Sequence, residues 1–182
     1  MFRNSCPGLH PGSPVGYSAK ALKGRNKQPR NDMAQSLCKN FVHLIFSTKQ
    51  RARLITEKIQ PELFKYLGGI LRNWESPSLI VGGVEDHVHI LFLLSKNHAL
   101  ADIVEEVKSS SSSWIKSKGP DFSGFYWQNG YGAFSVSQSN VPMVQEYIIN
   151  QKEHHRKMSF QEELRELLKR HEVAFDERYV WD

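Results

Sequence analysis

The chain has 182 residues, of which 40% are hydrophobic and 24% charged, with two cysteines and a formal net charge of +5. This length suits one domain plus an extension, and two cysteines define neither a disulfide framework nor a zinc knuckle. The longest apolar run, residues 90–94, is far too short to cross a bilayer, and the first thirty residues contain no apolar segment typical of a secretory signal. We therefore expect a cytoplasmic protein without a membrane partner.

The positive charge is concentrated near the start of the chain. Residues 1–32 hold six of the 24 basic residues and one of the 19 acidic residues, which leaves 18 of each kind in residues 33–182. The first segment is rich in Pro, Gly, Ser, Asn and Lys and shows no periodicity, so we predict a flexible basic extension followed by one folded domain at 33–182. A nucleic-acid surface on that domain would have to come from local clustering of charge.

The first half of the domain has a clear order of predicted elements. Alternating apolar residues at 37–47 predict a first strand, and an apolar stripe within 56–74 predicts a helix. Residues 78–84 and 86–94 are separated by a tight turn and predict an antiparallel hairpin. A helical period continues from Leu100 to Ile115, through a serine run of low helix propensity.

The second half adds short strand pieces at 125–127 and 131–136, and then helices. A helix is predicted from Asn140 to about His155, and Ser159 to Glu162 form a capping box that begins another helix, ending near His171. The order βαββαβ followed by helices is the split βαβ pattern. It predicts an α+β, ferredoxin-like fold with an antiparallel sheet and helices on one face.

Two histidines lie in the middle of the predicted strand at 86–94. Residues two apart on a strand point to the same face, so His87 and His89 project side by side while Val88 points toward a core. Two imidazoles supply half of a metal site, which with open positions would suit Mg²⁺ or Mn²⁺ bound to a phosphate oxygen. On spacing alone, the two histidines can also simply be surface residues on a solvent-facing side of the strand. Asp86 is expected to point to the opposite face, as a turn residue.

A tyrosine and an amide lie one helical turn apart in the segment predicted to run from Asn140 to His155. The Cβ atoms of Tyr147 and Gln151 are expected to be roughly 5–6 Å apart on one face. A tyrosine phenolate can attack a phosphodiester and form a covalent intermediate, a divalent metal ion can polarise that phosphate, and the amide oxygen can be a neutral third ligand. The alternative is a tyrosine at the edge of the core.

Basic residues follow Tyr147 on the same segment, where they can contact DNA phosphates or simply complement the helix dipole. This basic cluster consists of Lys152, His154, His155, Arg156 and Lys157. Aromatic residues upstream can stack on unpaired bases or pack in the core. They are Tyr126, Trp127, Tyr131 and Phe134.

Three motifs in this order carry a resemblance to a known family. HVHILF at 87–92, WQNGYGAFSVS at 127–137 and YIINQKEHHRK at 147–157 closely resemble the single-tyrosine HUH transposases of the smallest bacterial insertion sequences, including their REP-associated relatives. The resemblance covers roughly residues 33–182. It implies a ferredoxin-like fold, a homodimer, and metal-dependent cleavage and rejoining of single-stranded DNA beside hairpins.

The same resemblance implies roles for individual residues. His87 and His89 would be metal ligands, Gln151 a third ligand from the helix, and Tyr147 the nucleophile that forms a 5′-phosphotyrosine and frees a 3′-hydroxyl. That hydroxyl would later attack the phosphotyrosine linkage, so rejoining would need no ATP. We therefore expect a DNA transposase that acts as a single-strand endonuclease and ligase.

Other functions remain open from the sequence. A hairpin-binding or hairpin-processing protein that is no longer mobile would share the fold, although the intact set of candidate ligands and nucleophile argues against loss of chemistry. A replication initiator or relaxase is disfavoured by the short chain and by a histidine pair upstream of a lone tyrosine. An RNA-binding ferredoxin-like module would need aromatic residues on the central strands, where this chain has histidines.

Overall fold

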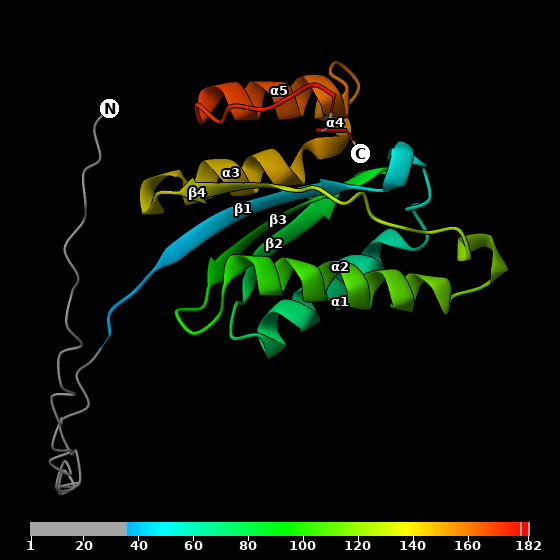
Figure 1. Ribbon diagram of the computed structural model, residues 1–182, viewed down its shortest axis with the longest axis horizontal. Helices are drawn as coiled ribbons and strands as arrows, with labels where there is room; N and C mark the ends of the chain where they lie inside the picture. Colours follow the sequence, from blue (N-terminus) through cyan, green and yellow to red (C-terminus); the bar gives the residue numbers. More distant parts are fainter. Residues whose placement is uncertain (1–35, 179, 182) are drawn as a thin grey trace, which may run out of the picture. The chain divides into compact units, whose positions relative to one another are not determined.

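A computed structural model describes residues 36–178, 180 and 181, and its framework is one antiparallel sheet (Figure 1). The strands are β1 (Asn40–Ser47), β2 (Ser78–Gly83), β3 (His87–Leu94) and β4 (Gly132–Val136), in the order β2–β3–β1–β4. The central strands β1 and β3 pair along their whole length, with Ile45 opposite His89. This sheet confirms the predicted α+β, ferredoxin-like class. The predicted extension at 1–32 lies outside the described residues.

Helices cover both faces of the sheet (Figure 1). The two crossover helices α1 (Gln60–Asn73) and α2 (Leu100–Lys116) share one face, so the prediction of helices on one face holds for these two but not for the C-terminal helices. The other face carries α3 (Val141–Ile149) and α5 (Phe160–Arg170), with the short α4 (Gln151–His154) between them. Short 3₁₀ turns lie at Lys49–Arg51, Pro120–Phe122 and Gln138–Asn140. No helix in the described part of the chain is both long and apolar enough to span a membrane.

The period-2 alternation of the strands builds a separate core on each face. On β3, Val88, Ile90 and Phe92 join the large cluster beneath α1 and α2. On the opposite face, Leu91 packs with Ile148 of α3. Further along this second face, the apolar stripe of α5 packs on β1 and β4; the cluster contains Ile45, Phe134, Phe160, Leu164, Leu167 and Leu168. His87 and His89 therefore lie beneath the C-terminal helices.

Several predicted boundaries were wrong by a few residues. The first strand begins at Asn40 instead of residue 37. The first helix begins at Gln60 instead of residue 56, although Pro61 lies in its first turn, as its residue type favours. The piece at 125–127 is not a strand, because Trp127 makes only an isolated bridge with Thr48. The single helix expected from residue 140 to 155 is interrupted at Asn150, a residue type of low helix propensity.

A glycine allows α3 to lie directly on β2. A Cβ atom built on Gly82 would be 2.7 Å from Cγ2 of Ile148 and 2.9 Å from its carbonyl oxygen, so only glycine permits this approach. A glycine inside a strand often marks a bulge or the close approach of a ligand or of another backbone. The close neighbour is a helix, and the irregular register of β2 lies instead between Ser78 and Ile80. This contact fixes the helix that carries Tyr147 against the sheet.

Candidate metal and nucleophile site

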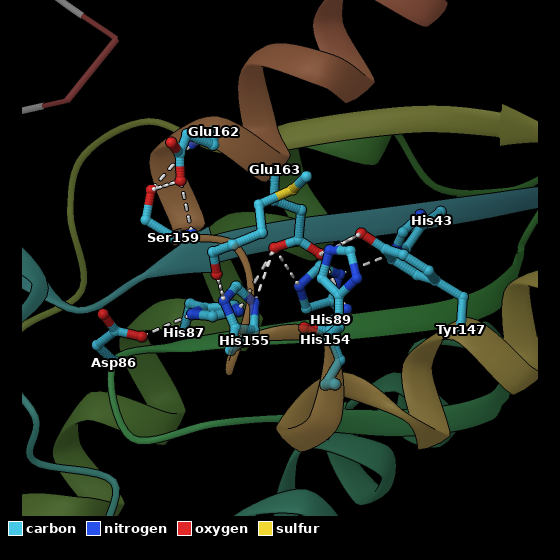
Figure 2. Close-up of polar contacts among 12 residues, drawn as sticks. His43, Asp86, His87, His89, Tyr147, His154, His155, Ser159, Glu162 and Glu163 are labelled. Carbon is cyan, nitrogen blue, oxygen red and sulfur yellow. Dashed lines mark hydrogen bonds and ion pairs between the residues drawn. The ribbon is translucent and has the colours of Figure 1, made fainter.

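His87 and His89 lie side by side on β3, with ring centroids 5.1 Å apart (Figure 2). Both share one face of the strand, while Val88 is buried in the core on the other face, as the spacing predicts. Both imidazoles are 0% exposed, because α4 and α5 cover them. The alternative that they are simple surface residues is therefore wrong.

Three histidines of the site, His87, His89 and His155, have the Nδ1 atom held by a neighbour. His87 Nδ1 lies 2.6 Å from Oδ1 of Asp86, and His89 Nδ1 lies 3.0 Å from Nε2 of His43 on β1. His155, which follows α4, has Nδ1 2.9 Å from the carbonyl oxygen of Met158. Metal-binding histidines are typically held in this way, because a partner on one ring nitrogen fixes the tautomer and aims the other nitrogen.

The position of Asp86 corrects the expectation that it points away from His87. Its carboxylate forms a hydrogen bond with the ring of His87. This is possible because Asp86 precedes β3, so its side-chain direction does not follow the alternation of the strand.

Burial lowers the pKa of His43 to about 3, and burial lowers the pKa of His89 to about 4. Both rings are thus neutral near pH 7, the form in which imidazole binds a metal.

Glu163 of α5 supplies a buried carboxylate that faces the histidines. Its Oε2 lies 3.0 Å from Nε2 of His155, 3.5 Å from that of His89 and 3.7 Å from that of His87. Burial alone would raise the pKa of Glu163, but His89 and the hydrogen bonds from its neighbours hold that pKa far below its ordinary value. Glu163 is therefore a buried anion.

Gln151 approaches the same carboxylate. Its Nε2 donates a hydrogen bond of 2.9 Å to Oε1 of Glu163, and its side chain is buried. The amide oxygen Oε1 has no hydrogen-bond partner within residues 36–178, 180 and 181. A buried amide oxygen without a donor is available as a ligand atom.

Five buried polar atoms of the site have no hydrogen-bond partner among the described residues. They are Nε2 of His87, His89 and His155, Oε1 of Gln151 and Oε2 of Glu163. The ligand atoms of the three histidines and Glu163 all lie within 4.8 Å of one another. Unpartnered buried polar groups are rare and costly, and a divalent cation would satisfy several nitrogen and oxygen atoms at once. The donor set therefore fits a metal ion.

Tyr147 of α3 stands at the edge of this donor set. Its ring lies edge-on to His89 and His43, with centroids 6.0 and 6.2 Å away, and its hydroxyl donates a hydrogen bond to Oε1 of Glu163 (Figure 2). Burial and the negative charge of Glu163 raise the pKa of Tyr147 above its ordinary value, against smaller opposite effects of Gln151 and Arg170. The phenol is protonated at rest, and it belongs to the same chain as the histidines.

The predicted basic cluster divides into two groups. His154 and His155 turn inward, with Nε2 of His154 3.5 Å from the Tyr147 hydroxyl and His155 beside His87. The cations mostly face solvent: Lys152 pairs with Glu57 at 2.8 Å and Arg156 pairs with Glu153 at 2.7 Å. Lys157 lines an open hollow of about 650 Å³ that has Tyr147 on its wall. The structure thus brings two of the five residues into the candidate site.

Two of the predicted aromatic residues are exposed. Tyr126 and Tyr131 reach the surface, whereas Trp127 and Phe134 are buried in the two cores. Core packing is therefore the role of Trp127 and Phe134.

Sequence reasoning missed Glu163 and gave His43 no role. A signal for Glu163 was present, since it lies within the apolar stripe formed by Phe160, Leu164 and Leu167, where a charged residue is unusual. No local signal marked His43, which approaches His89 from the neighbouring strand as a diagonal neighbour across the pair.

Comparisons with known proteins place the chain in a family. The family model of IS200-like transposases matches residues 35–151, which is well over half of the chain. Among curated proteins, none matches this chain. A solved structure of a candidate transposase from Deinococcus radiodurans R1 is 26% identical, with a TM-score of 0.51 over 71% of this chain and 96% of that chain. The sheet, the histidine pair, Tyr147 and Gln151 all fall within the matched residues.

A second similar structure is a REP-associated tyrosine transposase bound to a REP hairpin. It is 13% identical, with a TM-score of 0.50 over 66% of this chain and 72% of that chain, and at this identity the likeness concerns the fold. His155, Glu163 and the rest of α5 lie beyond the part of the chain that the family model matches. On the family match, this chain belongs to the IS200-like transposases.

Proposed function

We propose that this transposase cleaves and rejoins single-stranded DNA at hairpin-flanked sites, with Tyr147 as the nucleophile and a divalent metal ion as cofactor. The observation that carries the proposal is the convergence of five unpartnered donor atoms beside the Tyr147 hydroxyl. The REP hairpin bound by the similar transposase supports a hairpin substrate. Lys152, Arg156 and Lys157, which lie exposed beside this site, are the proposed phosphate contacts.

His87, His89 and Gln151 would hold the metal through Nε2, Nε2 and Oε1, with Glu163 and His155 as further donors. When bound, a divalent ion would polarise the scissile phosphate and offset its negative charge. The proposed cofactor is Mg²⁺ or Mn²⁺, and because imidazole nitrogens outnumber oxygens in this donor set, Mn²⁺ is the better fit.

The residues of the chain then define the chemical step. Tyr147 Oη attacks the phosphorus, so that an O–P bond to the tyrosine forms while the bond from phosphorus to the 3′-oxygen breaks. Glu163 Oε1, which already accepts the phenolic hydrogen bond, is placed to take the proton as the new bond forms. The proton ends on the released 3′-oxygen, and attack by that 3′-hydroxyl reverses every step and rejoins the strand.

The test uses labelled single-stranded DNA that carries a hairpin. Wild-type protein with Mn²⁺ should give a covalent adduct that survives a denaturing gel, and Tyr147→Phe should give none while still binding the hairpin, because only the hydroxyl is lost. Tyr126→Phe is the matched control, since the Tyr126 side chain is exposed and lines a different hollow, beside α2. An adduct that persists in Tyr147→Phe would show that the nucleophile is elsewhere.

A further inference from the structure

A second hollow lies against Tyr147, separate from the one that contains Lys157. It has a volume of about 390 Å³ and is formed by β4, α3 and the end of α5, with His43 of β1 also in its lining. We call it the β4–α5 pocket and define it by Phe134, Asn140, Tyr147, Leu167, Arg170 and His171. The proposed cleavage chemistry leaves this pocket without a role, although the nucleophile forms part of its wall.

The pocket combines an aromatic surface with a cation. His171 stacks on Phe134, with ring centroids 4.6 Å apart and an interplanar angle of 28°. Phe134 is buried, whereas His171 is exposed, so a face of the imidazole is open to a further ring. Arg170 is exposed beside it and has no ion pair within the described part of the chain.

These features match the chemistry of one nucleotide. Bases that are not paired stack on aromatic side chains, and a guanidinium donates well-directed hydrogen bonds to phosphate oxygens. The volume is within the usual range for small-molecule pockets, about 300–1,000 Å³. The exposed amide of Asn140 adds a donor and an acceptor that could distinguish base edges.

The position of the pocket suggests which nucleotide it would hold. Tyr147 is part of the wall of both hollows, the one with Lys157 and the β4–α5 pocket. A single strand whose phosphate meets the Tyr147 hydroxyl would therefore have neighbouring nucleotides on either side of that ring. The wall contributed by α5 lies outside the residues that match the family model, so it adds contacts beyond the shared motif.

We infer that the β4–α5 pocket binds one unpaired nucleotide adjacent to the scissile phosphodiester, with its base on His171 and a phosphate on Arg170, and that it helps to select the cleavage position. This inference rests on the proposed function, because it assigns a substrate contact of the same site. It makes Arg170 and His171 specificity residues and gives them no part in the chemical step.

The first experiment measures binding separately from cleavage. All variants are made in a Tyr147→Phe background, and the anisotropy of a fluorescent single strand with a hairpin and an unpaired flank is titrated. Arg170→Gln and His171→Ala should each weaken binding roughly tenfold, the order expected for loss of one phosphate contact or one stacked base. His171→Phe should restore binding, because it keeps the stacking surface. Lys169→Gln is the matched control, since it removes an exposed positive charge of α5 outside the pocket.

The second experiment reads the position of cleavage. A hairpin substrate with randomised flanking bases is cleaved with Mn²⁺, and the ends are sequenced. His171→Ala should flatten the base preference at one flanking position, whereas Lys169→Gln should not. Wild-type affinity in both pocket variants, together with an unchanged preference, would overturn the inference. If wild-type protein formed no adduct with any strand, the proposed function would fail, yet the anisotropy result would still decide whether the pocket binds a nucleotide.

Discussion

The hydroxyl of Tyr147 donates a hydrogen bond to Oε1 of Glu163, and this bond joins the candidate nucleophile to the candidate metal ligands. The two residues come from different helices, α3 and α5, and the other oxygen of Glu163 faces the histidines. The carboxylate of Glu163 therefore contacts both the candidate nucleophile and the candidate metal ligands. Its removal should affect metal binding and nucleophile position together.

The histidine pair should be essential and Gln151 less so. We expect His87→Ala or His89→Ala to abolish Mn²⁺- or Mg²⁺-dependent cleavage of a hairpin substrate, because each substitution removes a buried ligand atom. The variants should remain folded. Gln151→Ala should reduce the rate only in part, since water can replace one neutral ligand. His98→Ala is the control, because the ring of His98 packs at a tilt against Trp74, after the end of β3 that is opposite to His87. Undiminished cleavage in excess EDTA would contradict the metal assignment.

Glu163→Gln should weaken metal binding by at least about tenfold, because it removes the only negative charge among the donor atoms while keeping their shape. Calorimetric titration with Mn²⁺ measures this directly, and at one Mn²⁺ concentration the thermal midpoint should rise less in the variant than in the wild type. Glu166→Gln, on the exposed face of the same helix, provides the comparison. Equal affinity in the two variants would exclude Glu163 as a ligand.

The metal-free protein should lose stability in mild acid. The pKa values of His43 and His89 are lowered by burial to about 3 and about 4, so the folded state favours their neutral forms. The stability they contribute is complete above the ordinary pKa of 6.5 and declines as pH falls toward their folded values. His155, whose pKa is raised by Glu163 against the effect of burial, acts in the opposite direction, but it is one group against two.

Thermal unfolding in EDTA tests this dependence. The midpoint should fall between about pH 7.5 and about pH 5, and the fall should be smaller in His43→Gln, which cannot be protonated there. A wild-type midpoint that does not change over this range would contradict the prediction, because it would mean that protonation of the two buried histidines does not destabilise the folded state.

The proposal of a homodimer rests on the family resemblance. Light scattering should give a mass near twice the 21.0 kDa of one chain. Since Tyr147 and the histidines meet within one chain, dimer formation is expected to affect DNA architecture more than assembly of the site. A mass of one chain at high protein concentration would refute the dimer and leave the chemistry unaffected.

Relationships within one element were available from the sequence. Strand alternation placed His87 and His89 on one face with Val88 on the other, and apolar periods placed the helices and strands in the βαββαβ order. Side-chain direction within a strand or helix is set by the period of the backbone, so residue spacing alone was sufficient. The capping box at Ser159 and Glu162 was also correct, because both hydrogen bonds are local.

Relationships between elements were decided only by tertiary structure. His43 meets His89 through the register of β1 against β3, and Glu163 meets Tyr147 because the apolar stripe of α5 packs on Ile45 and Phe134. Asp86 reaches His87 through the geometry of a turn. The contacts of His43 and Glu163 have no fixed sequence spacing, because they depend on how separate apolar surfaces pack together. The sequence by itself therefore determined the fold class and the shared face of His87 and His89, whereas packing of α5 over the sheet determined which carboxylate faces these histidines.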